Sequence, residues 1–288
     1  MKTGWEYQRL TAVGVAIALC ACGDGDGTGP GGGVGNTDFE ASEDFSIGVP
    51  VTNQSSFALT GINGNLAVSG DPAATSVTVA GTKTVESSSV ADAEAFLDRA
   101  SVDVSSTSAV VTVETEQPGE TGGRNVSVDY RITVPSALRV TVANADGDIE
   151  IGGLDSGATV TNANGNVDLD AVDGDVVATL ANGNIEIAAM TGSVLAATTN
   201  GNASVEVISL PIGGELDLRT ANGNVQAMIP RNTSANVAAL VRNGRISVSD
   251  LSWTSVVQTP TTLAGILGAG EATIELLTVN GDIELSGI

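Results

Sequence analysis

Apolar residues recur at fixed distances from a series of Asn-Gly and Asp-Gly pairs in the second half of the chain. The glycines of these pairs stand at positions 147, 165, 183, 201, 223, 244 and 281, and the first three intervals are 18 residues each, followed by 22, 21 and 37. The positions seven and five before each glycine, and two and four after it, hold only Val, Ile, Leu and Ala. Because these positions follow a period of two on both sides of the pair, each repeat is predicted to contain two short strands, each with one buried face.

The two strands of each repeat could be arranged in either of two ways. An Asn-Gly pair is a strong signal for an antiparallel hairpin, whereas repeats of constant length that cannot bury their apolar faces alone are typical of stacked coils. The constant length favours the second arrangement. We therefore predict an all-β, single-domain parallel β-solenoid (β-helix) of about 18-residue coils, each stacked about 4.8 Å from the last, with the regular coils at 138–288.

The residue directly before each glycine is always Asn or Asp. These side chains tolerate left-handed backbone angles and bond the local backbone, and glycine takes positive φ freely. Stacked in register, they are predicted to form a structural ladder along one corner of the solenoid. The members of this predicted corner ladder are Asp146, Asn164, Asn182, Asn200, Asn222, Asn243 and Asn280.

The first half of the predicted domain, which spans 38–288, is also mostly strand. An early copy of the corner is present at Asn63-Gly64-Asn65. Ser89–Ala100 instead has near-helical spacing with Ser89 as the N-cap, which predicts one short helix that caps an end of the solenoid. The interval before Gly281 reads as an irregular insertion over 251–272, in which Trp253 is predicted to fill a gap in the core.

The N-terminus is typical of an export signal. Lys2 and Arg9 precede an apolar run that is too short to span a membrane and ends Leu19-Cys20-Ala21-Cys22, which resembles a bacterial lipobox. We predict a lipoprotein signal peptide at 1–21, lipidation of Cys22 with fatty acids such as palmitate, and a Gly-rich flexible tether at 22–37. An ordinary cleaved signal with an incidental cysteine is the alternative.

Composition and charge exclude several classes of function. The chain has 288 residues, no histidine, and 34 Asp plus Glu against 11 Lys plus Arg, a formal charge of −23. Absence of histidine excludes Ser-His-Asp and Cys-His catalysis and imidazole metal ligands. The negative charge disfavours nucleic acid as a partner, because that affinity depends largely on Lys and Arg. We expect no cofactor and no catalytic residues.

Acidic residues three positions after the glycines form a second column, with Glu150, Asp168 and Glu186 in successive repeats. A solvated acidic face is the simpler interpretation, and a candidate calcium site is the alternative, since calcium prefers oxygen ligands. The sequence lacks the nonapeptide pattern of calcium-binding β-rolls. A polysaccharide-active enzyme that uses Asp168 with Asp170, or Glu186 with a neighbouring carboxylate, is a further alternative, although a repeating column is an unusual place for an active site.

Several short motifs together resemble a known family. The lipobox, Gly61-Ile62-Asn63-Gly64-Asn65, Ile132-Thr133-Val134-Pro135 and the Asn-Gly-Asn corners are similar to those of bacterial "putative adhesin" domains of unknown function, including the head-GIN type. The resemblance implies a β-helical fold and brings no catalytic residues with it. We expect an acidic lipoprotein, held at the membrane of the bacterial cell envelope by its N-terminal lipid, that serves as a non-catalytic, adhesin-like scaffold for an envelope glycan or protein.

Overall fold

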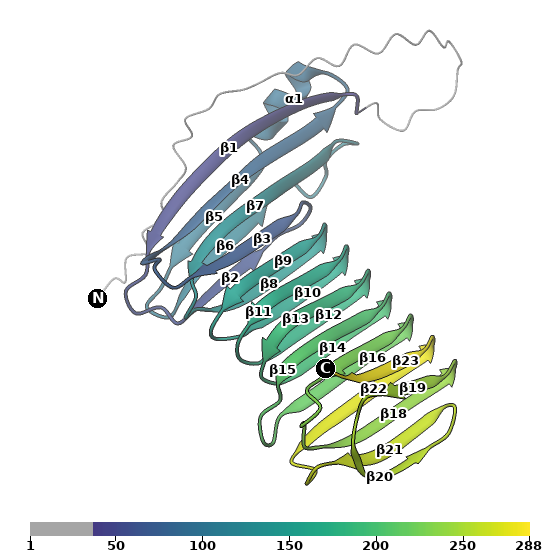
Figure 1. Ribbon diagram of the computed structural model, residues 1–288. Coiled ribbons are helices and arrows are strands. Elements are labelled where there is room, and N and C mark those ends of the chain that lie inside the picture. Colours follow the sequence, from purple (N-terminus) through teal and green to yellow (C-terminus); the bar gives the residue numbers. More distant parts are fainter. Residues whose placement is uncertain (1–36) are drawn as a thin grey trace, which may run out of the picture.

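The computed structural model describes residues 37–288, so the predicted signal peptide, Cys22 and nearly all of the tether lie outside the described residues. The described chain is all-β apart from one helix and builds two large, mostly parallel sheets that share one apolar core (Figure 1). From residue 139 to residue 229, consecutive strands alternate between the two sheets. Within residues 37–288, no helix is both long and apolar enough to cross a membrane.

Sheet A has 11 strands and sheet B has 12. In spatial order, sheet A consists of β1 (Phe39–Pro50), β4 (Ser76–Ser87), β7 (Asn125–Pro135), β3 (Leu66–Asp71), β9 (Ile149–Leu154), β11 (Val167–Val172), β13 (Ile185–Thr191), β15 (Ala203–Ser209), β17 (Val225–Ile229), β23 (Ile283–Gly287) and β19 (Ile246–Ser249). Sheet B consists of β20 (Trp253–Gln258), β21 (Thr262–Leu267), β18 (Ala235–Asn243), β22 (Ala272–Asn280), β16 (Glu215–Asn222), β14 (Val194–Asn200), β12 (Val176–Asn182), β10 (Ala158–Asn164), β8 (Arg139–Asp146), β2 (Ser56–Thr60), β6 (Val110–Glu116) and β5 (Ser101–Ser106).

The repeats pair in parallel, so the hairpin alternative at the Asn-Gly pairs is wrong. Strand β10 pairs in parallel with β8 on one side and β12 on the other, and β11 does the same with β9 and β13. The four apolar positions in each of the seven repeats make 28 in all, and 27 of them are buried. The exception is Val248, which is only partly buried on the edge strand β19. A core of Val, Ile, Leu and Ala fills the space between sheets because every strand directs alternate side chains inward.

The repeats do not stack in sequence order, which corrects the expectation that each coil lies on the last. Strand β22 lies between β16 and β18, and β23 lies between β17 and β19. The repeat of Gly281 therefore sits between those of Gly223 and Gly244. The physical reason is that the outer side of β18 is already paired with β21, which leaves its inner side for β22.

The N-terminal end has a similar interleaving. The early corner contributes β2 and β3, and these lie between the pair β6 and β7 and the pair β8 and β9. Antiparallel strands β1, β4 and β5 continue the two sheets beyond that point. Near each end, the chain thus inserts one repeat between two others that are closer to each other in the sequence.

The predicted helix is α1 (Val90–Leu97), and the Ser89 Oγ accepts a hydrogen bond of 3.2 Å from the Asp92 amide. It packs on β1 and β4 at the end of sheet A (Figure 1). Phe96 of this helix is buried, and the guanidinium groups of Arg99 and Arg124 lie 4.7 and 4.6 Å from the centroid of its ring. At the opposite end, the predicted insertion is the β20–β21 hairpin. Its Trp253 packs against the core, as do Leu263 and Leu267.

Candidate functional site

The residues before the glycines lie in one row along the corner where sheet B strands lead into sheet A strands. Each side-chain amide donates to the Oδ1 of its neighbour at 2.6–2.9 Å. The row follows spatial order, so Asn280 bonds Asn222 and Asn243 bonds Asn280. The structure brings together Asp146, Asn164, Asn182, Asn200, Asn222, Asn280 and Asn243 in this row.

A second ladder runs beside the first and was missed from the sequence. Every member except the first, Asp129, directly follows a corner glycine, and the backbone N–H of each of these members donates to the Oδ1 of the preceding member at 2.6–3.1 Å. The residue directly after the glycine is Asn or Asp in every repeat but one. An alignment of the repeats at that position would have predicted this second ladder. The row consists of Asp129, Asn65, Asp148, Asn166, Asn184, Asn202, Asn224, Asp282 and Arg245.

Buried polar side chains support the same corner from inside. Asn162 donates to the carbonyl oxygen of Gly147 at 2.8 Å, and Thr220 donates to that of Gly201 at 2.8 Å. Gly183 has φ of 132°, and a Cβ there would overlap the carbonyl oxygen of Gly165. The stacking distance itself therefore requires glycine at this corner, and the ladders hold successive corners at a fixed spacing.

The acidic column lies on the outer face of sheet A, close to the second ladder. Backbone pairing aligns Arg131 with Ala67, Ala67 with Glu150, Glu150 with Asp168, and Asp168 with Glu186. We call this set the charged row. Neighbouring strands are about 4.8 Å apart, so the three carboxylates are close enough to repel one another.

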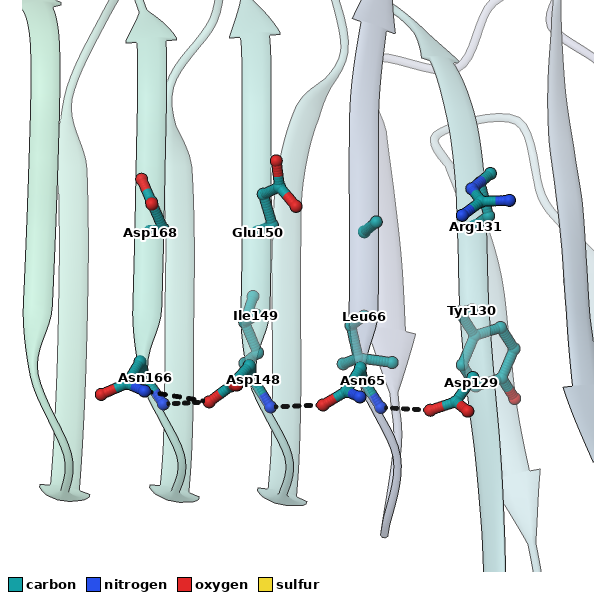
Figure 2. Close-up of a pocket in the computed structure, with 11 residues that line it drawn as sticks. Asn65, Leu66, Asp129, Tyr130, Arg131, Asp148, Ile149, Glu150, Asn166 and Asp168 are labelled. Atoms are coloured by element: carbon teal, nitrogen blue, oxygen red, sulfur yellow. Dashed lines mark hydrogen bonds between the residues drawn. The ribbon is translucent and has the colours of Figure 1, made fainter. Parts of the chain in front are cut away.

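A groove opens where the charged row passes Ala67. Two adjoining hollows of about 560 and 550 Å³ share Ala67, Arg131, Glu150 and Asp168 in their lining. Because Ala67 ends at Cβ while its neighbours Arg131 and Glu150 are long, the small residue leaves the space between them open. Figure 2 shows Arg131, Glu150 and Asp168 above the row of bonded polar residues from Asp129 to Asn166.

The electrostatics of the groove are mixed. Arg131 is exposed, and among the ion pairs within residues 37–288 none involves it. Partial burial raises the pKa of Asp168, and the carboxylates of Glu186, Glu150 and Asp170 raise it further. A guanidinium that can donate several hydrogen bonds thus faces a line of acceptor carboxylates across an open space.

This arrangement suits the binding of a polar ligand with both donor and acceptor groups, such as a carbohydrate. The described part of the chain holds no group of three or more His, Cys, Asp or Glu side chains placed to hold a metal ion. Asp168 and Asp170 share one face of β11, about 6.6 Å apart along the strand.

Solved structures similar to this chain come from bacteria. A "putative cell adhesion protein" from Clostridium sporogenes is 13% identical, with 86% of this chain and 100% of that chain covered and a TM-score of 0.40. A "putative lipid binding protein" from Parabacteroides distasonis is 10% identical, with coverages of 85% and 96% and a TM-score of 0.37. Since both TM-scores are below 0.5, neither likeness supports a conclusion about this chain.

No curated protein matches the sequence. The model of one protein family does match, over residues 125–286, which include β7 to β22, all of β23 except Gly287, and all seven Asn-Gly and Asp-Gly corners from Gly147 to Gly281. The chain therefore belongs to the Toastrack DUF4097 family, a family of domains of unknown function.

Proposed function

We propose that this protein is a lipid-anchored, non-catalytic binding scaffold of the bacterial cell envelope, with an adhesin-like role. The groove at Ala67, between Arg131 and Glu150, is the observation that carries the proposal. It is an irregularity in an otherwise repeating face and offers both a hydrogen-bond donor and acceptors. In this proposal the parallel repeats are coils of a β-solenoid, which makes the scaffold rigid.

The ligand that we propose is an envelope glycan. Sugar hydroxyls both donate and accept hydrogen bonds, which suits a guanidinium opposite carboxylates. The outer face of sheet A continues from the groove along β11 and β13 (Figure 1), so an extended glycan chain could follow the charged row from strand to strand.

The lipid anchor is supported by the lipobox that ends at Cys22 and by the Gly-rich stretch that follows it. The predicted tether then leads directly into β1, which is the edge strand of sheet A. The lipid would be the membrane partner of the protein, and the scaffold would project from it.

A screen of the purified full chain against a panel of envelope glycans, read for both binding and product release, tests the proposal. We expect binding without product release, and we expect Ala67→Leu to weaken binding because it fills the groove. Ser204→Leu is the matched control, since Ser204 lies in the same row on β15, away from the groove. Release of product would show an enzyme instead. If no glycan binds, or if both variants bind like the parent, the groove is not a glycan site.

A further inference from the structure

The two sheets have four edges, and three of them carry features that block pairing with another strand. Edge strand β1 contains Glu40, Glu43 and Asp44, β5 contains Asp103, and β19 is only four residues long. Edge strand β20, with the sequence WTSVVQ, has no charged residue. Natural proteins protect sheet edges with charges or short strands, so β20 is the exception in this molecule.

The side of β20 that faces away from β21 has backbone groups available for hydrogen bonding to another strand. Every residue from Thr254 to Gln258 is exposed, including Val256 at 44% and Val257 at 71%. The amide of Thr259 donates to the carbonyl of Thr262 at 2.8 Å at the hairpin turn. Because antiparallel bonds alternate along a strand, Val256 and Gln258 direct their backbone groups away from β21, toward the open side.

We propose that β20 pairs antiparallel with β20 of a second copy of this chain and joins two molecules end to end. A two-fold axis at such a junction makes the contact self-complementary. It also brings Val257 of each copy beside the other strand and extends the outward apolar surface that includes Ala264 and Leu240.

Where two copies of this acidic chain meet, charge repulsion is least at β20. The chain carries −23, and the charged row adds a line of carboxylates along sheet A, so side-by-side association of two copies is repulsive. Pairing at β20 puts an uncharged strand against an uncharged strand. The two bodies then extend in opposite directions from the junction, which keeps their acidic faces apart.

The position of β20 suggests that this pairing serves in adhesion between two membranes. That role rests on the proposed lipid anchor and scaffold function. Strand β1, which follows the predicted tether, lies at one end of the stack, and β20 lies at the other (Figure 1). The eleven strands of sheet A, from β1 to β19, span about 48 Å at a spacing of 4.8 Å, and β20 lies at the β19 end of the stack. Copies anchored on two facing membranes would therefore meet at their distal ends, so the pairing is a form of homophilic adhesion.

A six-residue strand buries little area, so a single junction belongs with weak, transient interfaces. Many copies on each surface would strengthen the contact through multivalency without new contacts.

Sedimentation velocity of the full chain tests the pairing. Cys22→Ala in every sample prevents lipid-driven association, and reducing conditions prevent disulfides through Cys20. We expect a shift from monomer to dimer as concentration rises to about 100 µM, a range suited to weak interfaces. Val257→Lys should abolish the shift. Thr179→Lys, which adds the same charge on the exposed outer face of sheet B, should retain it.

Circular dichroism of each variant verifies that the fold is intact, and the exposed position of Val257 makes loss of folding unexpected. A parent chain that stays monomeric overturns the inference, and so does a dimer that Val257→Lys does not affect or that Thr179→Lys abolishes. None of these outcomes concerns the groove or the lipid anchor. Failure here therefore leaves the proposed function standing, and failure of the glycan screen leaves the pairing standing.

Discussion

Asn182 donates a hydrogen bond of 2.9 Å from its side-chain amide to the Oδ1 of Asn164, its register partner one repeat earlier. Asn200 donates to Asn182 in the same way at 2.8 Å, so Asn182, like other internal members of the ladder, donates one hydrogen bond and accepts one. The corner thereby continues the hydrogen bonding of the sheets beyond the ends of the strands.

Replacement of Asn182 by Ala removes both of these bonds. Since a typical hydrogen bond contributes about 1 kcal/mol net, we expect Asn182→Ala to lower the free energy of unfolding by about 1–2 kcal/mol with an unchanged dependence on urea. Thr179→Ala, on the same strand and exposed on the outer face of sheet B, is the control. Equal urea midpoints for the two variants would mean that the ladder adds no stability.

Gly183→Ala is expected to be more damaging than loss of a ladder bond. The new Cβ would overlap the carbonyl of Gly165, and alanine is strained at a φ of 132°. We expect a loss of at least about 2 kcal/mol, measured by thermal unfolding. Gly48→Ala on β1 is the matched control, because a Cβ at Gly48 meets no atom within 4 Å. Similar melting temperatures for both variants would contradict the close-packed corner.

Because Asp168 lies among other carboxylates in the charged row, we expect its neutralisation to raise the free energy of unfolding by an amount that depends on pH. Its pKa is raised above 3.8 by partial burial and by Glu186, Glu150 and Asp170, so the folded state binds a proton more readily than the unfolded state. The contribution of Asp168 to the free energy of unfolding therefore increases as the pH falls from neutral through the raised pKa, and this gain is complete below 3.8.

Asp168→Asn lacks this dependence. We expect it to be more stable than the parent at pH 7 by up to about 0.5 kcal/mol, with the advantage lost near pH 3.5. Urea titrations at several pH values measure the difference, and Asp103→Asn, an exposed acid on β5, is the control. An Asp168→Asn variant less stable than the parent at pH 7 would show that the carboxylate has a favourable partner.

Calcium distinguishes a solvated acidic row from a metal site. We expect millimolar calcium to leave the melting temperature nearly unchanged, because Glu150, Asp168 and Glu186 form a line along the sheet rather than a cage. A rise of several degrees, equivalent to about 1 kcal/mol, would show calcium binding to the folded state if it were absent from Asp168→Asn and from samples with magnesium.

The lipid anchor is tested by Cys22→Ala with fractionation of cells. We expect the parent protein in the membrane fraction and the variant in the soluble fraction, because removal of the thiol removes the site of lipidation. Cys20→Ala is the control and should stay with the membrane. Equal membrane retention of parent and Cys22→Ala would contradict lipidation at Cys22.

The sequence was sufficient for the strands and parallel pairing of the repeats and for the helix at Ser89, because each depends on local spacing and capping. It did not predict the antiparallel pairing of β1, β4 and β5 at one end or of β20 and β21 at the other. Spatial order was not predictable from the repeat. The repeats of Gly244 and Gly281 present equivalent apolar columns, so either could stack on that of Gly223, and only the pairing of β18 with β21 decides between them. The groove was missed for a different reason: Ala67 and Arg131 are 64 positions apart in the sequence and meet only through the pairing of β3 with β7.

The interleaving of β22 and β23 has a consequence during synthesis of the chain. Until residues 272–287 are available for folding, β16 and β17 have an unfilled neighbouring layer, and β18 and β19 carry matching side chains that could dock there directly. A nascent chain that closed in this way would be one layer short and would have to reopen before the late segment could enter. We expect competition between the two layers to act as a kinetic trap that slows folding when the last repeat arrives late.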